Sequence, residues 1–272
     1  MNETSKEKEM SNEVVSYELD GDVAMIGLNR PEKRNAFNDV LHKQLHAAVM
    51  RAGEEAKCGV LFGHGECFCA GLDLAYAASM WESEKDHKLP YPRNYDTELI
   101  ARGRIPFVSA LHGATIGGGF EAAASTHIRV ADETAFFALP EGQRGIFVGG
   151  AGSVRISRLI GTALMTDLML TGRVLSAEEA LRFNAVQYVV PKGQALDKAL
   201  ALARRICANA PLTNFAVTNA LPRIRDMSYD DGIFVERLVS EYTLSAETTA
   251  RLSDFLNKKA APIKAPEGGE AP

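Results

Sequence analysis

Residues 110–123, ALHGATIGGGFEAA, place three consecutive glycines between an apolar run and a segment that favours a helix. Because glycine has no side chain, the backbone N–H groups at the start of this helix would be bare and accessible. Such a helix terminus stabilises negative charge, so the Gly118 N–H could hold an oxyanion that develops during a reaction. A simpler interpretation is that the glycines only allow the strand and the helix to pack closely.

The segments around this stretch repeat the order strand, helix, strand, which predicts a layered α/β domain. Two such units are expected from apolar residues that recur at strand or helix spacing. Their segments are residues 14–19, 23–28, 39–55 and 59–62 in the first unit, and residues 107–111, a helix opening near Gly117 and residues 128–130 in the second.

Beyond residue 153 the apolar residues recur at helical spacing, interrupted by a predicted strand at 186–190. Two long helices are predicted near the end of the chain, over 213–227 and over 229–259. The chain is therefore expected to divide near residue 190. Its predicted parts are a disordered N-terminal extension at 1–12, a mixed core at 13–190, a helical region at 191–260 and a flexible tail at 261–272.

The composition is that of an ordinary globular protein. Of the 272 residues, 46% are hydrophobic and 24% are charged, and the formal net charge of -5 offers no basic surface for nucleic acid. Neither a membrane-spanning apolar run nor a signal-peptide pattern is present, so a cytoplasmic location without membrane attachment is expected. The cysteines lack the spacing of a disulfide framework and are expected to be reduced thiols.

Residues 65–74, GECFCAGLDL, form a second glycine-containing segment after a predicted buried strand. A reacting carbonyl needs about two N–H donors, and two separate glycine-bearing loops that follow two strands could bring them together. The alternative is an ordinary turn in which a buried Asp73 caps the following helix.

Two glutamates are the candidate acid and base. Glu141 lies between Pro140 and Gly142 after an apolar run, so the loop should be stiff and the carboxyl desolvated. Desolvation raises the pKa of a carboxyl, which suits a general acid. Glu121 follows the three glycines and would lie in the first turn of their helix. Two carboxylates beside one anion site suit the addition of water to an activated double bond, although either could instead be a surface or helix-start acid.

Other chemistries find little support in the sequence. His42 and His46 are four residues apart but lack the intervening glutamate of a zinc-protease motif, so no metal site is expected. The dinucleotide fingerprint, the Walker A sequence and the serine-hydrolase elbow are also missing.

Six segments together resemble the crotonase superfamily of enoyl-CoA hydratases and isomerases in their order and spacing, over about residues 14–260. They are residues 28–37 (LNRPEKRNAF), 67–74 (CFCAGLDL), 112–121 (HGATIGGGFE), 131–141 (from Ala131-Asp to Leu139-Pro-Glu), 158–161 (RLIG) and 170–173 (LTGR). The resemblance implies a spiral of ββα units with a C-terminal helical region that trimerises, giving a homotrimer or a homohexamer built as a dimer of trimers.

The resemblance also implies an acyl-CoA thioester substrate and a set of site residues. The thioester carbonyl would be held by the N–H groups of Leu72 and Gly118, with Glu121 and Glu141 as catalytic acids. CoA is part of the substrate, so no separate cofactor is implied. The residues implied to bind CoA are Lys33 and Arg34 (phosphates and pantetheine), Ala70 and Asp73 (adenine), and Phe255 and Lys258 (contributed to a neighbouring subunit).

Glutamate at both catalytic positions matches the hydratase pattern, whereas isomerases commonly keep one. Within the family, residues 121–127 and 139–150 most resemble methylthioacryloyl-CoA hydratases of bacterial dimethylsulfoniopropionate breakdown. That resemblance implies hydration followed by thioester hydrolysis, with release of methanethiol, acetaldehyde, CO2 and CoA. The alternatives are a general short-chain enoyl-CoA hydratase, an isomerase or acyl-CoA hydrolase on the same fold, and a CoA-binding protein without catalysis.

Overall fold

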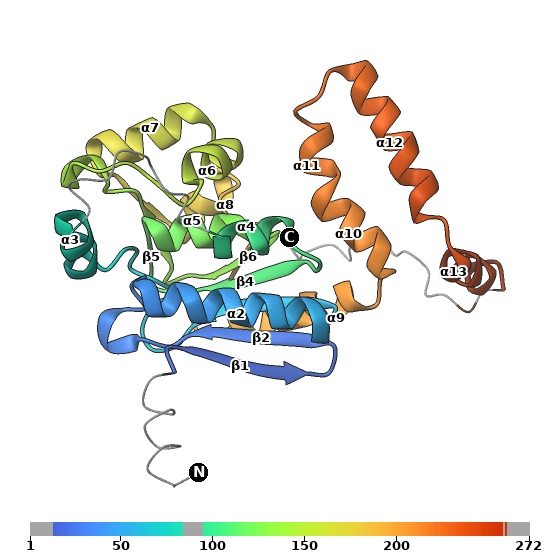
Figure 1. The fold of residues 1–272 in the computed structure, drawn as a ribbon, viewed down its shortest axis with the longest axis horizontal. Helices are drawn as coiled ribbons and strands as arrows, with labels where there is room; N and C mark the ends of the chain where they lie inside the picture. Colours follow the sequence, from blue (N-terminus) through green and yellow to red (C-terminus); the bar gives the residue numbers. More distant parts are fainter. Residues whose placement is uncertain (1–12, 84–94, 258, 260–272) are drawn as a thin grey trace, which may run out of the picture.

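A twisted, mostly parallel sheet forms the centre of the molecule in the computed structural model, which describes residues 13–83, 95–257 and 259 (Figure 1). Among the described strands of this sheet, only the first two pair in antiparallel orientation. Within the described residues the strand order is β1 (Val15–Asp20), β2 (Val23–Leu28), β3 (Cys58–Gly63), β4 (Phe107–Leu111), β6 (Ile128–Asp132) and β9 (Tyr188–Val190). The expected α/β class is thus confirmed.

A smaller sheet stands beside the first and consists of β5 (Ala114–Ile116), β7 (Phe136–Ala138) and β8 (Val174–Ser176). β5 follows β4 directly and leads into α5 (Gly118–Ser125), so the chain leaves the large sheet where the three glycines begin. Gly113 and Gly117 both adopt φ of 53°, a left-handed conformation that side chains disfavour. These two glycines make the sharp turns before and after β5.

Helices cover both faces of the large sheet because its strands alternate apolar side chains between the two faces. On β3, Leu61 belongs to the cluster that contains the apolar stripe of α2 (Asp39–Glu55), whereas Cys58 and Val60 belong to the cluster formed with α9 (Ala195–Cys207). The helical region expected from residue 191 therefore begins with a helix that packs on the sheet.

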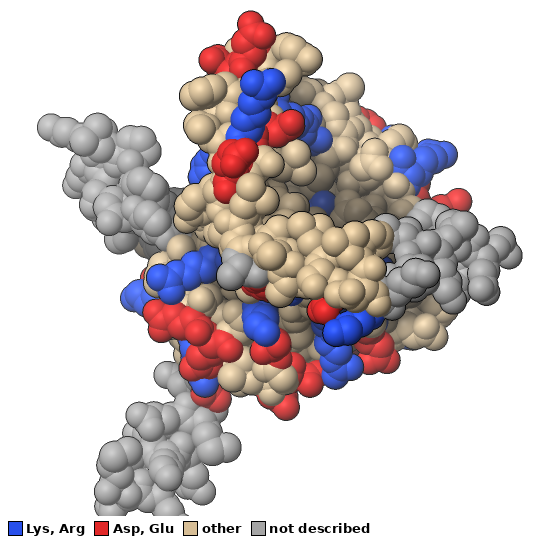
Figure 2. All heavy atoms as spheres, turned by 90° about the vertical axis from the view of Figure 1, so that its right-hand side faces the viewer, with Lys and Arg blue, Asp and Glu red and all other residues tan. Residues whose placement is uncertain are grey.

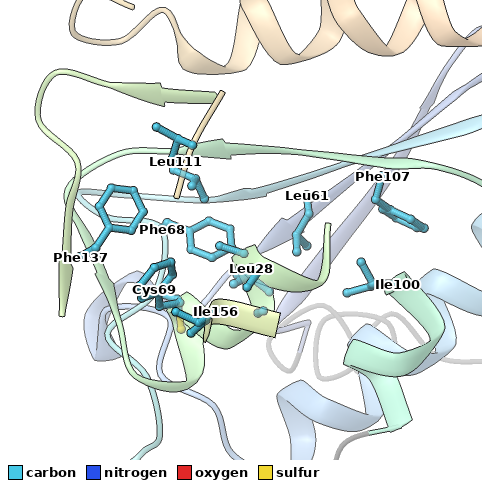
Figure 3. Close-up of a cluster of buried hydrophobic side chains, with 14 of the residues drawn as sticks. Leu28, Leu61, Phe68, Cys69, Ile100, Phe107, Leu111, Phe137 and Ile156 are labelled. Atoms are coloured by element: carbon cyan, nitrogen blue, oxygen red, sulfur yellow. The ribbon is translucent and has the colours of Figure 1, made fainter. Parts of the chain in front are cut away.

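The larger cluster fills the space between the sheet, the second sheet and the helices α2, α4 (Tyr95–Arg102), α5 and α6 (Gly152–Ile160). Figure 3 labels part of this cluster, namely Leu28, Leu61, Phe68, Cys69, Ile100, Phe107, Leu111, Phe137 and Ile156. Phe120 on α5 lies 5.2 Å from Phe137 on β7, centroid to centroid. Burial of each such ring stabilises the fold by about 1.5–3 kcal/mol and fixes α5 against the second sheet.

The remaining helices surround this core or extend from it. They are α3 (Leu74–Ser83), α7 (Thr162–Thr171), α8 (Ala177–Arg182), α10 (Pro211–Asn219), α11 (Leu221–Ile224), α12 (Tyr229–Thr243) and α13 (Ala246–Leu256), with short 3₁₀ turns η1 (Pro31–Lys33) and η2 (Gly142–Arg144). α10 to α13 form an arm that projects from the core in Figure 1. No helix of the described segments is long and apolar enough to cross a membrane.

Two expectations for the arm are wrong in their boundaries. The helix predicted over 213–227 is split into α10 and α11, since Pro222 has no N–H with which to continue the helical ladder. The helix predicted over 229–259 is also split: Leu244 is extended, and Ser245 caps α13 through a capping box with Thr248. The predicted segments 1–12 and 261–272 lie outside the described residues.

Candidate active site

Glu121 lies in the first turn of α5 and is 5% exposed. Its Oε1 accepts hydrogen bonds from the backbone N–H groups of Gly150, at 2.7 Å, and Gly152, at 2.8 Å. The fit is close, because a Cβ on Gly152 would lie 2.7 Å from the Glu121 Cγ and one on Gly150 would lie 3.2 Å from its Cδ. Residues 150–152 thus form a small cradle that fixes one oxygen of this carboxylate.

Burial raises the pKa of Glu121 above its ordinary value, while the amides of Gly152, Gly150 and Gly149 and the charge of Arg155 act in the opposite direction. These donors stabilise the ionised form. Glu121 therefore binds a proton more strongly than an ordinary glutamate, and the amides around it stabilise its charged form. A general base requires both properties.

Glu141 lies directly before η2 and is 6% exposed. Its Oε2 is buried and has no hydrogen-bond partner among the described residues. A Cβ on Gly117 would lie 2.7 Å from the Glu141 Oε1, so the carboxyl lies against the backbone at the start of α5. Burial raises the pKa of Glu141, the negative charge of Glu121 raises it further, and Arg144 lowers it. A buried carboxyl beside another carboxylate favours the protonated form.

Two backbone N–H groups lie beside this pair. A Cβ on Gly118 would be 3.7 Å from the nitrogen of Leu72, so the two amides are neighbours. Neither amide donates to another group within the described part of the chain. Gly118 is the first residue of α5, where helical N–H groups lack an internal partner and the helix dipole is positive. The two loops expected to converge therefore do so and could bind one oxygen atom.

The loop that carries Leu72 is held by a residue that the sequence did not single out. Asn35 is fully buried, and its side-chain nitrogen donates to the carbonyls of His64 (2.9 Å), Cys67 (2.9 Å) and Phe68 (3.1 Å). Arg34 and Asn35 both adopt positive φ, a conformation that asparagine tolerates better than most residues. The asparagine at this position was therefore the signal that the sequence offered.

Four of the residues expected to bind CoA come from the N-terminal part of the chain, and they lie on two adjoining loops. Lys33 and Arg34 are exposed, and the Arg34 carbonyl accepts a hydrogen bond from the Ala70 N–H at 2.9 Å. Asp73 forms an ion pair with Arg30 at 3.3 Å and accepts a hydrogen bond from the Tyr76 N–H at the start of α3. Asp73 thus caps the following helix, as in the alternative interpretation of this segment, but its side chain is 16% exposed rather than buried.

Phe255 is not brought to these residues within one chain. It is exposed on α13, which Figure 1 shows at the far end of the arm from α3. Lys258 lies outside the described residues.

The chain matches the sequence profile of the family described as Enoyl-CoA hydratase/isomerase over residues 18–265. A probable enoyl-CoA hydratase of Rhizobium meliloti is 32% identical over 260 residues, which cover 94% of this chain and 99% of the relative. An enoyl-CoA hydratase of Mycobacterium tuberculosis is 35% identical over 221 residues, covering 79% and 83% of the two chains. The crystal structure of a putative enoyl-CoA hydratase from Rhodopseudomonas palustris is similar, with a TM-score of 0.82, 43% identity and coverage of 91% and 96%. The expected crotonase-like fold is confirmed.

Proposed function

The chain belongs to the enoyl-CoA hydratase/isomerase family, and we propose that it adds water across the double bond of an α,β-unsaturated acyl-CoA thioester. The observation that carries this proposal is the pair of buried glutamates, Glu121 and Glu141, beside the amides of Leu72 and Gly118, which have no partner among the residues that the structure describes. A hydratase needs two proton-transfer groups and a site for an enolate oxygen, and these residues meet both requirements.

The different surroundings of the two acids favour different roles in proton transfer. Glu121, whose charge the cradle amides stabilise, takes a proton from water as the water attacks the β-carbon. Glu141, whose charge is opposed by burial and by Glu121, delivers a proton to the α-carbon. The thioester oxygen, which gains negative charge as the enolate forms, accepts from Leu72 and Gly118. Lys33 and Arg34 bind the phosphates and pantetheine, and Ala70 and Asp73 contact the adenine.

We propose methylthioacryloyl-CoA as the substrate. Support comes from the resemblance of residues 121–127 and 139–150 to hydratases of that compound, and these two segments meet where Gly150 donates to Glu121. Water would add at the carbon that bears the methylthio group, and the resulting hemithioacetal would expel methanethiol to leave an aldehyde thioester. A second water would cleave this thioester to CoA and a 3-oxo acid, which loses CO2 to give acetaldehyde.

The same site could serve the hydrolysis. An oxyanion site that stabilises an enolate also stabilises the charge formed when the thioester carbonyl is attacked. Glu121 is then a candidate nucleophile through an anhydride with the acyl group, as well as a base.

Two substrates test the proposed hydratase reaction and the proposed substrate separately. Wild-type protein incubated with methylthioacryloyl-CoA is expected to release methanethiol and free CoA thiol, and with crotonyl-CoA to remove the conjugated thioester absorbance. Hydration of crotonyl-CoA without methanethiol from the sulfur compound would contradict the proposed substrate and leave a general hydratase. No reaction with either compound would contradict the hydratase itself.

We also propose that the chain assembles as a homotrimer or a homohexamer through the arm. α12 and α13 expose large apolar side chains that a solvated helix would not carry, and Figure 2 shows uncharged atoms over much of this end of the molecule. The exposed apolar side chains of α12 and α13 include Tyr229, Phe234, Leu238, Tyr242, Leu252, Phe255 and Leu256. Phe255 and Lys258 would then complete the CoA site of a neighbouring subunit.

Truncation before Phe255 is expected to weaken CoA binding, because the neighbour's contribution is removed. A rise in Kd of about tenfold corresponds to the loss of about 1.4 kcal/mol. The variant Phe255→Ala tests the ring alone, and Leu19→Ala removes another exposed apolar side chain, on β1, as the matched control. Light scattering that finds a monomer, together with unchanged Kd after truncation, would contradict the proposal.

A further inference from the structure

Arg155 on α6 contacts the cradle that holds Glu121. Its Nη1 donates to the carbonyl oxygen of Gly150 at 2.9 Å, and the N–H of the same Gly150 donates to the Glu121 Oε1 at 2.7 Å. The Arg155 side chain is 13% exposed. A single glycine therefore separates a partly buried guanidinium from the carboxylate.

Arg155 is itself held by α4. Its Nη2 donates to the Glu98 Oε1 in a short ion pair. α4 is anchored two residues earlier, where the carboxylate of Asp96, 2% exposed, lies 2.8 Å from the Nδ1 of His42 on α2. Glu98 thus presents its charge from a fixed helix and orients the guanidinium toward Gly150.

The backbone of the cradle needs this support. Ala151, between the two glycines that bind Glu121, adopts a φ of 63°. A non-glycine residue in this left-handed conformation is strained and persists only where its surroundings fix it. The Gly150 and Gly152 N–H groups donate to Glu121, and Arg155 donates to the Gly150 carbonyl, so hydrogen bonds fix Ala151 on both sides.

We propose that Arg155 is a positioning residue for Glu121. Together with Glu98 it fixes the Gly150 carbonyl, so that the Gly150 and Gly152 N–H groups point at Oε1, and its charge favours the ionised carboxylate. This inference rests on the proposed role of Glu121 as the base.

The charges around Glu121 set the direction of the expected pH effect. Burial raises the pKa of Glu121, and Arg155 is the cation that lowers it. Glu141 faces Glu121 across the site, while Glu98, Arg102 and Asp96 act on Arg155. Loss of the Arg155 charge raises the pKa of Glu121, so the base becomes protonated at a higher pH. The acid limb of the kcat profile then moves to higher pH.

The test compares three variants with crotonyl-CoA over a range of pH. Arg155→Met is expected to lower kcat by about tenfold to 100-fold with KM nearly unchanged, because a misplaced catalytic group lowers turnover more than binding. Its acid limb should move to higher pH. Arg155→Lys restores the charge but not the two-pronged contact, so the limb should return toward its wild-type position while kcat recovers in part. Arg158→Met, three residues along α6, removes a surface pair with Asp226 and should change neither quantity.

Wild-type kcat and an unmoved acid limb in Arg155→Met would overturn the inference. If Arg155→Met does not fold, Glu98→Gln is the deciding variant: lower kcat at unchanged KM supports the inference, and wild-type kcat overturns it. Glu121→Gln in the same assay separates the two claims. An active Glu121→Gln overturns the proposed function, whereas an inactive Glu121→Gln beside a fully active Arg155→Met overturns the positioning role alone.

Discussion

Replacing either Glu121 or Glu141 by glutamine is expected to lower kcat for crotonyl-CoA at least about hundredfold, the loss typical of a general acid or base. Glutamine keeps the size of each side chain and, at position 121, the acceptor oxygen that the cradle binds. It cannot take up or deliver the proton. The measurement is the rate of loss of the conjugated thioester absorbance under saturating substrate. Glu133→Gln, which alters an exposed carboxylate shortly before Glu141, is the control and should retain wild-type turnover.

The stability of these variants separates lost chemistry from lost folding. Burial raises the pKa of both carboxyls in the folded protein, from an ordinary value of 4.5. A raised folded-state pKa contributes stability at pH below the unfolded value, and this stability is lost as pH rises through the folded value. At neutral pH the glutamine variants should therefore melt no lower than the wild type. Near wild-type kcat in either variant would remove that residue from the mechanism.

Gly118→Ala is expected to lower kcat by about 100-fold to 1000-fold, or about 3 kcal/mol, the effect of losing one oxyanion donor. A Cβ at this position meets nothing closer than 3.7 Å, so the fold should accept it. The new methyl group would stand beside the Gly118 and Leu72 amides and occupy part of the space that the thioester oxygen needs to reach both.

Gly53→Ala provides the control for Gly118→Ala, since Gly53 is also helical and its Cβ would make only ordinary contacts, the nearest at 3.6 Å. Gly53→Ala should keep wild-type kcat. Wild-type kcat in Gly118→Ala would remove this amide from the proposed oxyanion site. So would a complex in which the thioester oxygen lies beyond hydrogen-bond distance of both amides.

The parts of the site that the sequence predicted depend on local signals. The glycines at 117–119 are needed locally, where Gly117 adopts positive φ and α5 begins, and Glu121 follows at a fixed helical offset. Glu141 was predicted from its flanking Pro140 and Gly142, and the structure shows its carboxyl buried as expected, although residues 142–145 after it are exposed. The central strands were also predicted from a local signal, because β3 and β4 are short apolar runs that the structure buries almost completely.

The parts that the sequence did not reveal depend on contacts between distant segments. Arg155 and Glu98 are 57 residues apart, and no local pattern indicates that they pair. Asn35 acts on carbonyls about 30 residues away. The three-residue strands β5 and β8 are too short for a period of two to show in the sequence. They are recognised as strands only from their pairing with β7.

The reaction of crotonyl-CoA in water labelled with ¹⁸O distinguishes hydration from isomerisation and hydrolysis, because only hydration places the label on the β-carbon. The proposed hydratase activity gives a product that has gained one water, with the label on the β-carbon and the thioester intact. A product of unchanged mass with a shifted double bond, or a free acid that carries the label in its carboxylate and keeps its double bond, would contradict it.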